Sequence, residues 1–175
     1  PHEYTPQKEE LLDERLLATP AVAVQRSHEI TVRMMDAARE AVELAIGLNK
    51  EYSEENMARV QALEDETDHY QDALGSYLVK LSGAEMNHDD NRTLNNLLYT
   101  ISDIERIGDH ALNLAEAAKE MAEKKINFSD AAKAELVVLE QAILDMLAKV
   151  ANAFEYNDLA KAMKVEPHEE VIDSL

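Results

Sequence analysis

The chain has 175 residues, enough for one domain with a sizeable core, and its formal net charge is −19. This charge argues against direct binding to nucleic acids or anionic lipids, and the absence of Cys excludes disulfides and thiolate-metal sites. Aromatic residues make up only 5%, with four Gly and four Pro, so the composition indicates an all-α protein. No apolar run reaches the roughly 20 residues that span a bilayer.

The first 20 residues are polar, and we expect a linker that ends in a short amphipathic segment over 11–17. Thr19 and Pro20 then form a helix start, with Thr as the N-cap and Pro at the first helical position. The sequence begins at Pro1 without an initiator Met, so we expect a piece of a longer protein.

Helical periodicity predicts four long helices and the start of a fifth. Ser53 and Ser129 precede the second and the fourth and are expected to cap them. The connections are short, so neighbouring helices are antiparallel and the predicted architecture is a helical bundle. The predicted ranges are about 20–49, 54–82, 89–125, 130–155 and a segment from 157 onward.

The second and third helices carry apolar stripes with alternating spacings of three and four residues, as in packed helices. Glu105 falls within the stripe of the third helix, where an apolar side chain is expected, and Gly108 is predicted to leave space between the helices. The first stripe is Val60, Leu63, Thr67, Tyr70, Leu74, Tyr77 and Leu81. The second is Leu94, Leu98, Ile101, Glu105, Gly108, Leu112 and Ala115.

Part of the sequence occurs twice, with a shift of 105 positions. The simplest interpretation is a tandem of three-helix units, a first repeat over about 21–128 and a truncated second repeat over 129–175. The sixth helix of such a pair is missing from this sequence. The matching pairs are Val60 with Val165, Glu64 with Glu169, and Asp68 with Asp173.

Two acidic motifs share one spacing, with a Glu and an Asp four residues apart. They are Glu64 with Asp68 in the second helix and Glu105 with Asp109 in the third, and each pair lies on one helix face. The midpoint between the motifs falls between Met86 and Asn87, inside the break between the helices. A hairpin of these helices therefore brings the four carboxylates to one height, which is a candidate cation site.

Oxygen ligands suit hard cations such as Mg²⁺, Ca²⁺ or Mn²⁺, and carboxylate clusters also hold iron. His69 and His110 directly follow the motifs and are candidates for additional ligands, which would favour iron or zinc. Glu66 and His69 form a single Glu-x-x-His motif, and a di-iron oxidase is disfavoured because its bundle needs this motif from two helices. The competing interpretation is a solvated acidic face, with Glu105 paired to an Arg or a Lys.

Signatures of catalysis are lacking. The sequence has no Gly-rich phosphate loop, nucleophile elbow or zinc-protease motif. We therefore expect a protein that is not an enzyme, with a metal-dependent phosphoesterase as the least favoured alternative.

The stretch SDIERIGDHALNLAE at 102–116 closely resembles the signature of the PhoU family, and LEDETD at 63–68 resembles that family's companion acidic motif. The resemblance spans about 21–175. It implies tandem three-helix repeats whose acidic motifs bind metal, here iron, zinc, manganese or magnesium. It assigns Glu64, Asp68, Glu105 and Asp109 as ligands of the first repeat, and Glu169 and Asp173 as the beginning of a second site.

Residues 11–23, LLDERLLATPAVA, are similar to the segment that joins the membrane part of bacterial Na⁺/phosphate cotransporters to their PhoU-like domain. The resemblance implies a regulatory domain of such a cotransporter, on the cytoplasmic side of the cell membrane. The expected partner is the membrane transporter portion of the same chain or a phosphate-signalling protein, with a homodimer left open. The alternative is a free-standing PhoU-type negative regulator of phosphate uptake and signalling.

Overall fold

A computed structural model of the chain describes residues 12–156, and all the regular secondary structure in this part is helical. Each long helix begins and ends within one residue of its predicted range. No helix in the described part has the length and apolarity of a membrane span. The predicted helix from 157 lies outside the described residues. The elements are a short 3₁₀ helix η1 (Glu14–Ala18), α1 (Pro20–Leu48), α2 (Glu54–Leu81), α3 (His88–Lys124) and α4 (Asp130–Glu155).

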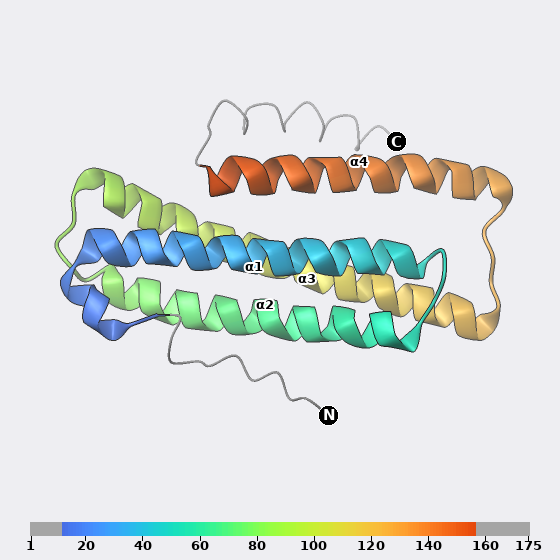
Figure 1. Ribbon diagram of the computed structural model, residues 1–175, viewed down its shortest axis with the longest axis horizontal. Coiled ribbons are helices and arrows are strands. Elements are labelled where there is room, and N and C mark those ends of the chain that lie inside the picture. The colour runs from blue at the N-terminus through green and yellow to red at the C-terminus, as the bar shows by residue number, and fades with distance from the viewer. Residues whose placement is uncertain (1–11, 157–175) are drawn as a thin grey trace.

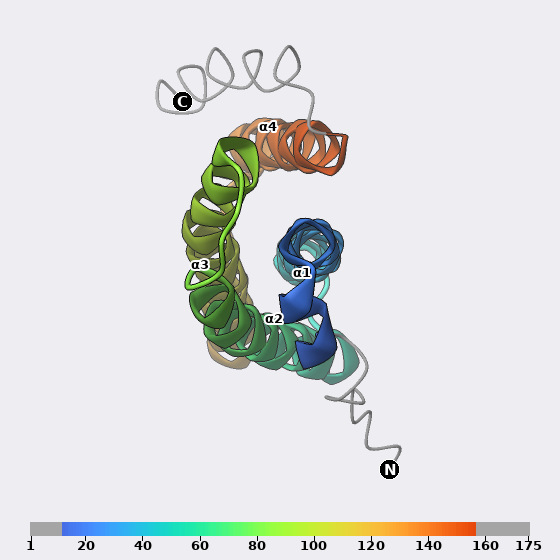
Figure 2. The same cartoon turned by 90° about the vertical axis from the view of Figure 1, so that its left-hand side faces the viewer.

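The four long helices form an antiparallel bundle, as predicted (Figure 1). The end-on view shows α2, α3 and α4 arranged in an arc, with α1 on its concave side (Figure 2). Helix α1 packs closely on α2 and α3, which also pack on each other, whereas α4 packs mainly on α1. The hairpin of α2 and α3 therefore forms one outer face of a three-helix unit.

Side-chain caps fix the starts of two helices as predicted. Ser53 and Ser129 each accept a hydrogen bond from the backbone N–H three residues further on, at 3.1 and 3.2 Å. Thr19 occupies the N-cap position of α1, but its side chain makes no cap hydrogen bond. Its hydroxyl donates instead to the carbonyl of Leu16 at 3.2 Å, so the start of α1 depends on Pro20.

The predicted stripe of α2 faces the core, but the stripe of α3 is partly wrong. Ile104 is only 1% exposed and occupies the seam position assigned to Glu105, which is half-buried beside the seam. The helix has two nearly equivalent rows, and it buries the continuous apolar one because burying an unpaired carboxylate is costly. The buried row of α3 is Leu94, Leu97, Ile101, Ile104, Gly108, Ala111, Ala115 and Ala118.

The core consists of two hydrophobic clusters, one toward each end of the bundle. On α2 the boundary between them lies between Leu63 and Leu74, and on α3 it lies between Ile104 and Ala111. Ile107 packs against both clusters. Both acidic motifs therefore lie at the middle level of the bundle, where the apolar packing changes from one cluster to the other.

The segment before α1 is docked on the bundle. Leu16 and Leu17 of η1 pack against the first core cluster. The Tyr77 hydroxyl of α2 donates to the carbonyl of Asp13 at 3.0 Å, and Lys80 of α2 pairs with Glu14 at 2.5 Å. The end of the predicted linker is thus attached to the C-terminal end of α2.

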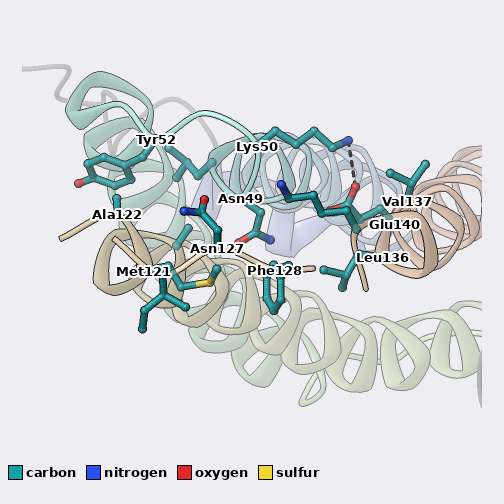
Figure 3. A pocket seen from close by; sticks show the side chains of 14 residues that line it. Asn49, Lys50, Tyr52, Met121, Ala122, Asn127, Phe128, Leu136, Val137 and Glu140 are labelled. Carbon is teal, nitrogen blue, oxygen red and sulfur yellow. Dashed lines mark ion pairs between the residues drawn. The ribbon is translucent and has the colours of Figure 1, made fainter. Parts of the chain in front are cut away.

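A cavity of about 490 Å³ lies at the other end of the bundle, between the α1–α2 turn, the end of α3 and the start of α4 (Figure 3). Beside it, Lys50 Nζ lies 2.9 Å from Oε2 of Glu140, whose residue is only 8% exposed. This ion pair attaches α4 to the turn after α1. No residue of the two acidic motifs lines the cavity.

Candidate metal centre

Three of the four predicted carboxylates come together on the outer face of the α2–α3 hairpin. Carboxylate oxygens of Glu64, Asp68 and Asp109 all lie within 4.8 Å of one another. Glu64 and Asp109 are half-buried and Asp68 is exposed. The antiparallel hairpin thus brings the two motifs to one level, as the spacing predicts.

The local geometry follows from the row that each helix buries. Thr67 is fully buried against α3, so Glu64 and Asp68, one turn before it and one residue after it, lie at the rim of the interface. The Thr67 hydroxyl donates to the Glu64 carbonyl at 2.8 Å. On α3, Asp109 directly follows the buried Gly108 and reaches the same rim.

Glu105 lies beside this group but outside it. The pKa of Glu105 is raised by partial burial and then by the negative charges of Asp109 and Asp68, and Arg106 opposes this rise. The charges of the group therefore affect the carboxylate of Glu105, although Glu105 is not one of the three residues whose oxygens all lie within 4.8 Å of one another. No ion pair with a Lys or an Arg holds Glu105 in the described part of the chain, so the pairing suggested for Glu105 in the competing interpretation is not found there.

The carboxylates of the group raise one another's pKa values, in addition to the effect of burial. The pKa of Glu64 is raised, first by burial and then by Asp68, Asp65, Asp109 and Glu105. The pKa of Asp68 is raised as well, first by burial and then by Asp109. Within residues 12–156 no ion pair with Lys or Arg compensates these charges. A bound cation would relieve this repulsion.

The two histidines stand apart from the group. His69 is exposed, and its Nδ1 lies 2.5 Å from the carbonyl of Asp65, one turn back on the same helix. His110 is exposed and is not part of the group of three carboxylates. The candidate residues of a second site, Glu169 and Asp173, lie outside the described residues.

The donor set fits a hard cation. The group offers carboxylate oxygens alone, which suit Mg²⁺, Mn²⁺, Ca²⁺ or ferric iron better than zinc, whose sites are usually built from nitrogen and sulfur. Glu64, Asp68 and Asp109 would hold the ion, with Glu105 beside them. A cation bound here would link α2 to α3.

Sequence reasoning missed how the interface beneath the carboxylates is filled. Gly108 was expected to leave space between the helices, but the side chain of Thr67 occupies that space. Thr67 stood on the predicted stripe as an ordinary packing residue. No sequence signal identifies this contact, because the distance between two helices depends on how they pack against each other.

Comparison with known protein families places the candidate site within a recognised domain. Residues 31–118, just over half of the chain, match the PhoU domain family, and this range contains both acidic motifs. No curated protein and no solved structure matches the chain. The match covers all of α2 and most of α1 and α3. The chain therefore belongs to the PhoU family.

Proposed function

We propose that this chain is a metal-binding regulatory domain of a Na⁺/phosphate cotransporter, that it acts on the cytoplasmic side of the membrane, and that it is not an enzyme. The observation that carries the metal-binding part is the approach of Glu64, Asp68 and Asp109 within 4.8 Å, without a cationic partner among the described residues. The PhoU family supports a role in the regulation of phosphate transport.

The cation would give an otherwise repulsive surface a positive centre. Inorganic phosphate is an anion, so the carboxylates alone repel it. When bound, the metal would supply a Lewis-acidic centre that a phosphate oxygen can approach. The carboxylates of Glu64, Asp68 and Asp109 would hold the ion in place, and their own negative charge would keep other anions away from the surrounding face.

Helix α2 connects this site to the segment around η1, which precedes α1. Glu64 and Asp68 lie in its middle, and Tyr77 and Lys80 near its C-terminal end hold the segment around η1. In a cotransporter, that segment would follow the membrane part. A change of metal occupancy that shifts α2 would therefore reach the membrane part directly through this attachment.

The cotransporter context is tested in two ways. The coding sequence before Pro1 should encode transmembrane helices, whereas a start codon within a few residues would favour a free-standing regulator of phosphate uptake and signalling. In cells that express the full-length transporter, sodium-dependent phosphate uptake should decrease when phosphate is high. The D68N/D109N variant should retain the uptake but should not show this decrease. An unchanged decrease in the double variant would contradict a regulatory role of the site.

The enzyme alternative has a separate test. Protein loaded with Mn²⁺ or Fe³⁺ should hydrolyse p-nitrophenyl phosphate no faster than the D109N variant under the same conditions. Turnover that requires both the metal and Asp109 would overturn the assignment as a regulatory domain without catalysis.

A further inference from the structure

Gly108 and Thr67 make an unusually close contact between α2 and α3. A Cβ atom added at Gly108 would lie only 2.6 Å from Oγ1 of Thr67 and 3.5 Å from its Cβ. Thr67 is 0% exposed, and Gly108 is buried as well. Gly108 has a negative φ, so close approach rather than an unusual backbone conformation calls for glycine here.

This contact lies directly beneath the candidate metal centre. Thr67 is flanked on α2 by Glu64 and Asp68, and Gly108 is followed on α3 by Asp109. Carboxylates on two helices can share one ion only within a limited range of interhelical distance, since metal–oxygen bonds are short and the Asp and Glu side chains must reach the same ion. The contact between residues 67 and 108 is a close approach of the two helices beside these carboxylates.

We propose that the Thr67–Gly108 contact is the positioning contact of the metal centre: it holds α2 and α3 at the distance at which Glu64, Asp68 and Asp109 coordinate one cation. This inference rests on the proposed metal binding. Neither residue is one of the three candidate ligands, and both act through the spacing of the helices that carry those ligands.

The G108A substitution tests this contact without removing a ligand. The added methyl group forces Thr67 or the backbone to move, because the contact of 2.6 Å is too short for real atoms. Ala is a better helix former than Gly, so a loss of metal affinity would not reflect a weaker helix. Gly75 provides a matched control in the same interface, where a Cβ would meet only Cδ1 of Ile101 at 3.8 Å.

The experiment measures Mn²⁺ binding to the 175-residue chain by isothermal titration calorimetry after metal removal. G108A should weaken binding by about tenfold or more, the range seen when groups that support metal ligands are lost. G75A should bind within about twofold of the wild type. The double variant T67A/G108A should recover most of the affinity, since it removes the Oγ1 atom that the new methyl group meets.

The distance between the helices provides a second readout. The natural chain has no Cys, so spin labels at Q61C on α2 and N113C on α3 report this distance without interference. G108A should lengthen it, and T67A/G108A should restore it. If G108A does not fold, T67V, which places a methyl group where the hydroxyl lies, should lengthen the distance and weaken Mn²⁺ binding relative to T67A.

The outcomes separate this inference from the proposed function. Wild-type affinity in G108A, or a double variant as weak as G108A, would overturn the positioning role and leave the metal site standing. A wild-type chain that binds neither Mn²⁺ nor another cation would overturn the metal site, and the positioning role with it.

Discussion

At the scale of single residues, the candidate site is a set of carboxylates that lie close together and repel one another. Glu64, Asp68 and Glu105 all have raised pKa values, and in each case burial is the largest cause and neighbouring carboxylates come next. The sequence predicted these residues from their spacing. It could not show that Glu105 lies outside the closest group. The rows through Ile104 and Glu105 differ by only one position, and the sequence does not decide which of the two side chains faces the seam.

Neutralising one carboxylate should stabilise the metal-free chain. E64Q should raise the free energy of unfolding by about 0.5 kcal/mol, since like charges one turn apart on a helix are destabilising by this order. Urea denaturation in the presence of a chelator measures the change. E85Q, at an exposed position in the turn between α2 and α3, serves as the control and should change the free energy of unfolding by less.

The same pKa shifts predict how the stability of the metal-free chain depends on pH. A raised pKa means that the folded state binds more protons than the unfolded state, so protonation of these carboxyl groups stabilises the folded chain. This stabilisation is fully present below about pH 4, near the ordinary carboxyl range. It is lost as the pH rises through the raised pKa values of Glu64 and Glu105.

The stabilisation of E64Q/E105Q relative to the wild type should therefore grow between about pH 4 and pH 7. Chemical denaturation at several pH values, again with a chelator, measures it. A constant difference over this range would show that the two carboxylates do not repel their neighbours in the folded chain.

At the scale of the elements, local signals determine most of the fold. The bounds of α1 to α4 follow from cap residues, the polar break around Met86 and the helical period, and they agree with the sequence prediction to within one residue. The helical period alone does not decide whether α3 buries the row through Ile104 or the row through Glu105. That choice depends on how α3 packs against two other helices at once.

Capping provides a test at this scale. S53A should destabilise the chain by about 1 kcal/mol, because it removes a side-chain hydrogen bond to the backbone N–H of Asn56. T19A should destabilise it by less than about 0.5 kcal/mol, since Thr19 makes no cap hydrogen bond and its hydroxyl contact is exposed. Thermal denaturation of both variants compares them, and equal losses would contradict the cap assignment.

At the scale of the whole molecule, the bundle places the candidate site between two core clusters, on a hairpin that a cation would tie together. The sequence indicated this level, because the two motifs lie at equal distances from the Met86–Asn87 midpoint. It could not provide the close Thr67–Gly108 contact, because interhelical distance is a property of packed helices and not of one helix. The candidate ligands Glu169 and Asp173 remain a prediction.

Metal should stabilise the whole chain. At a Mn²⁺ concentration about 100 times the dissociation constant, the free energy of unfolding should rise by about 2.7 kcal/mol. The rise should be absent in D109N, and a chelator should reverse it in the wild type. Equal stabilisation of the wild type and D109N would point to weak binding elsewhere on the acidic surface.

The most direct test of the metal centre is the metal content of the chain purified without added metal. Elemental analysis should find a stoichiometric amount of one hard cation in the wild type, and the amount in D68N/D109N should fall to background. The control D103N/D130N, which changes two exposed acidic residues outside the group and produces the same net charge, should retain the metal. Equal metal content in all three proteins would contradict the account and would make the carboxylates of α2 and α3 a solvated surface.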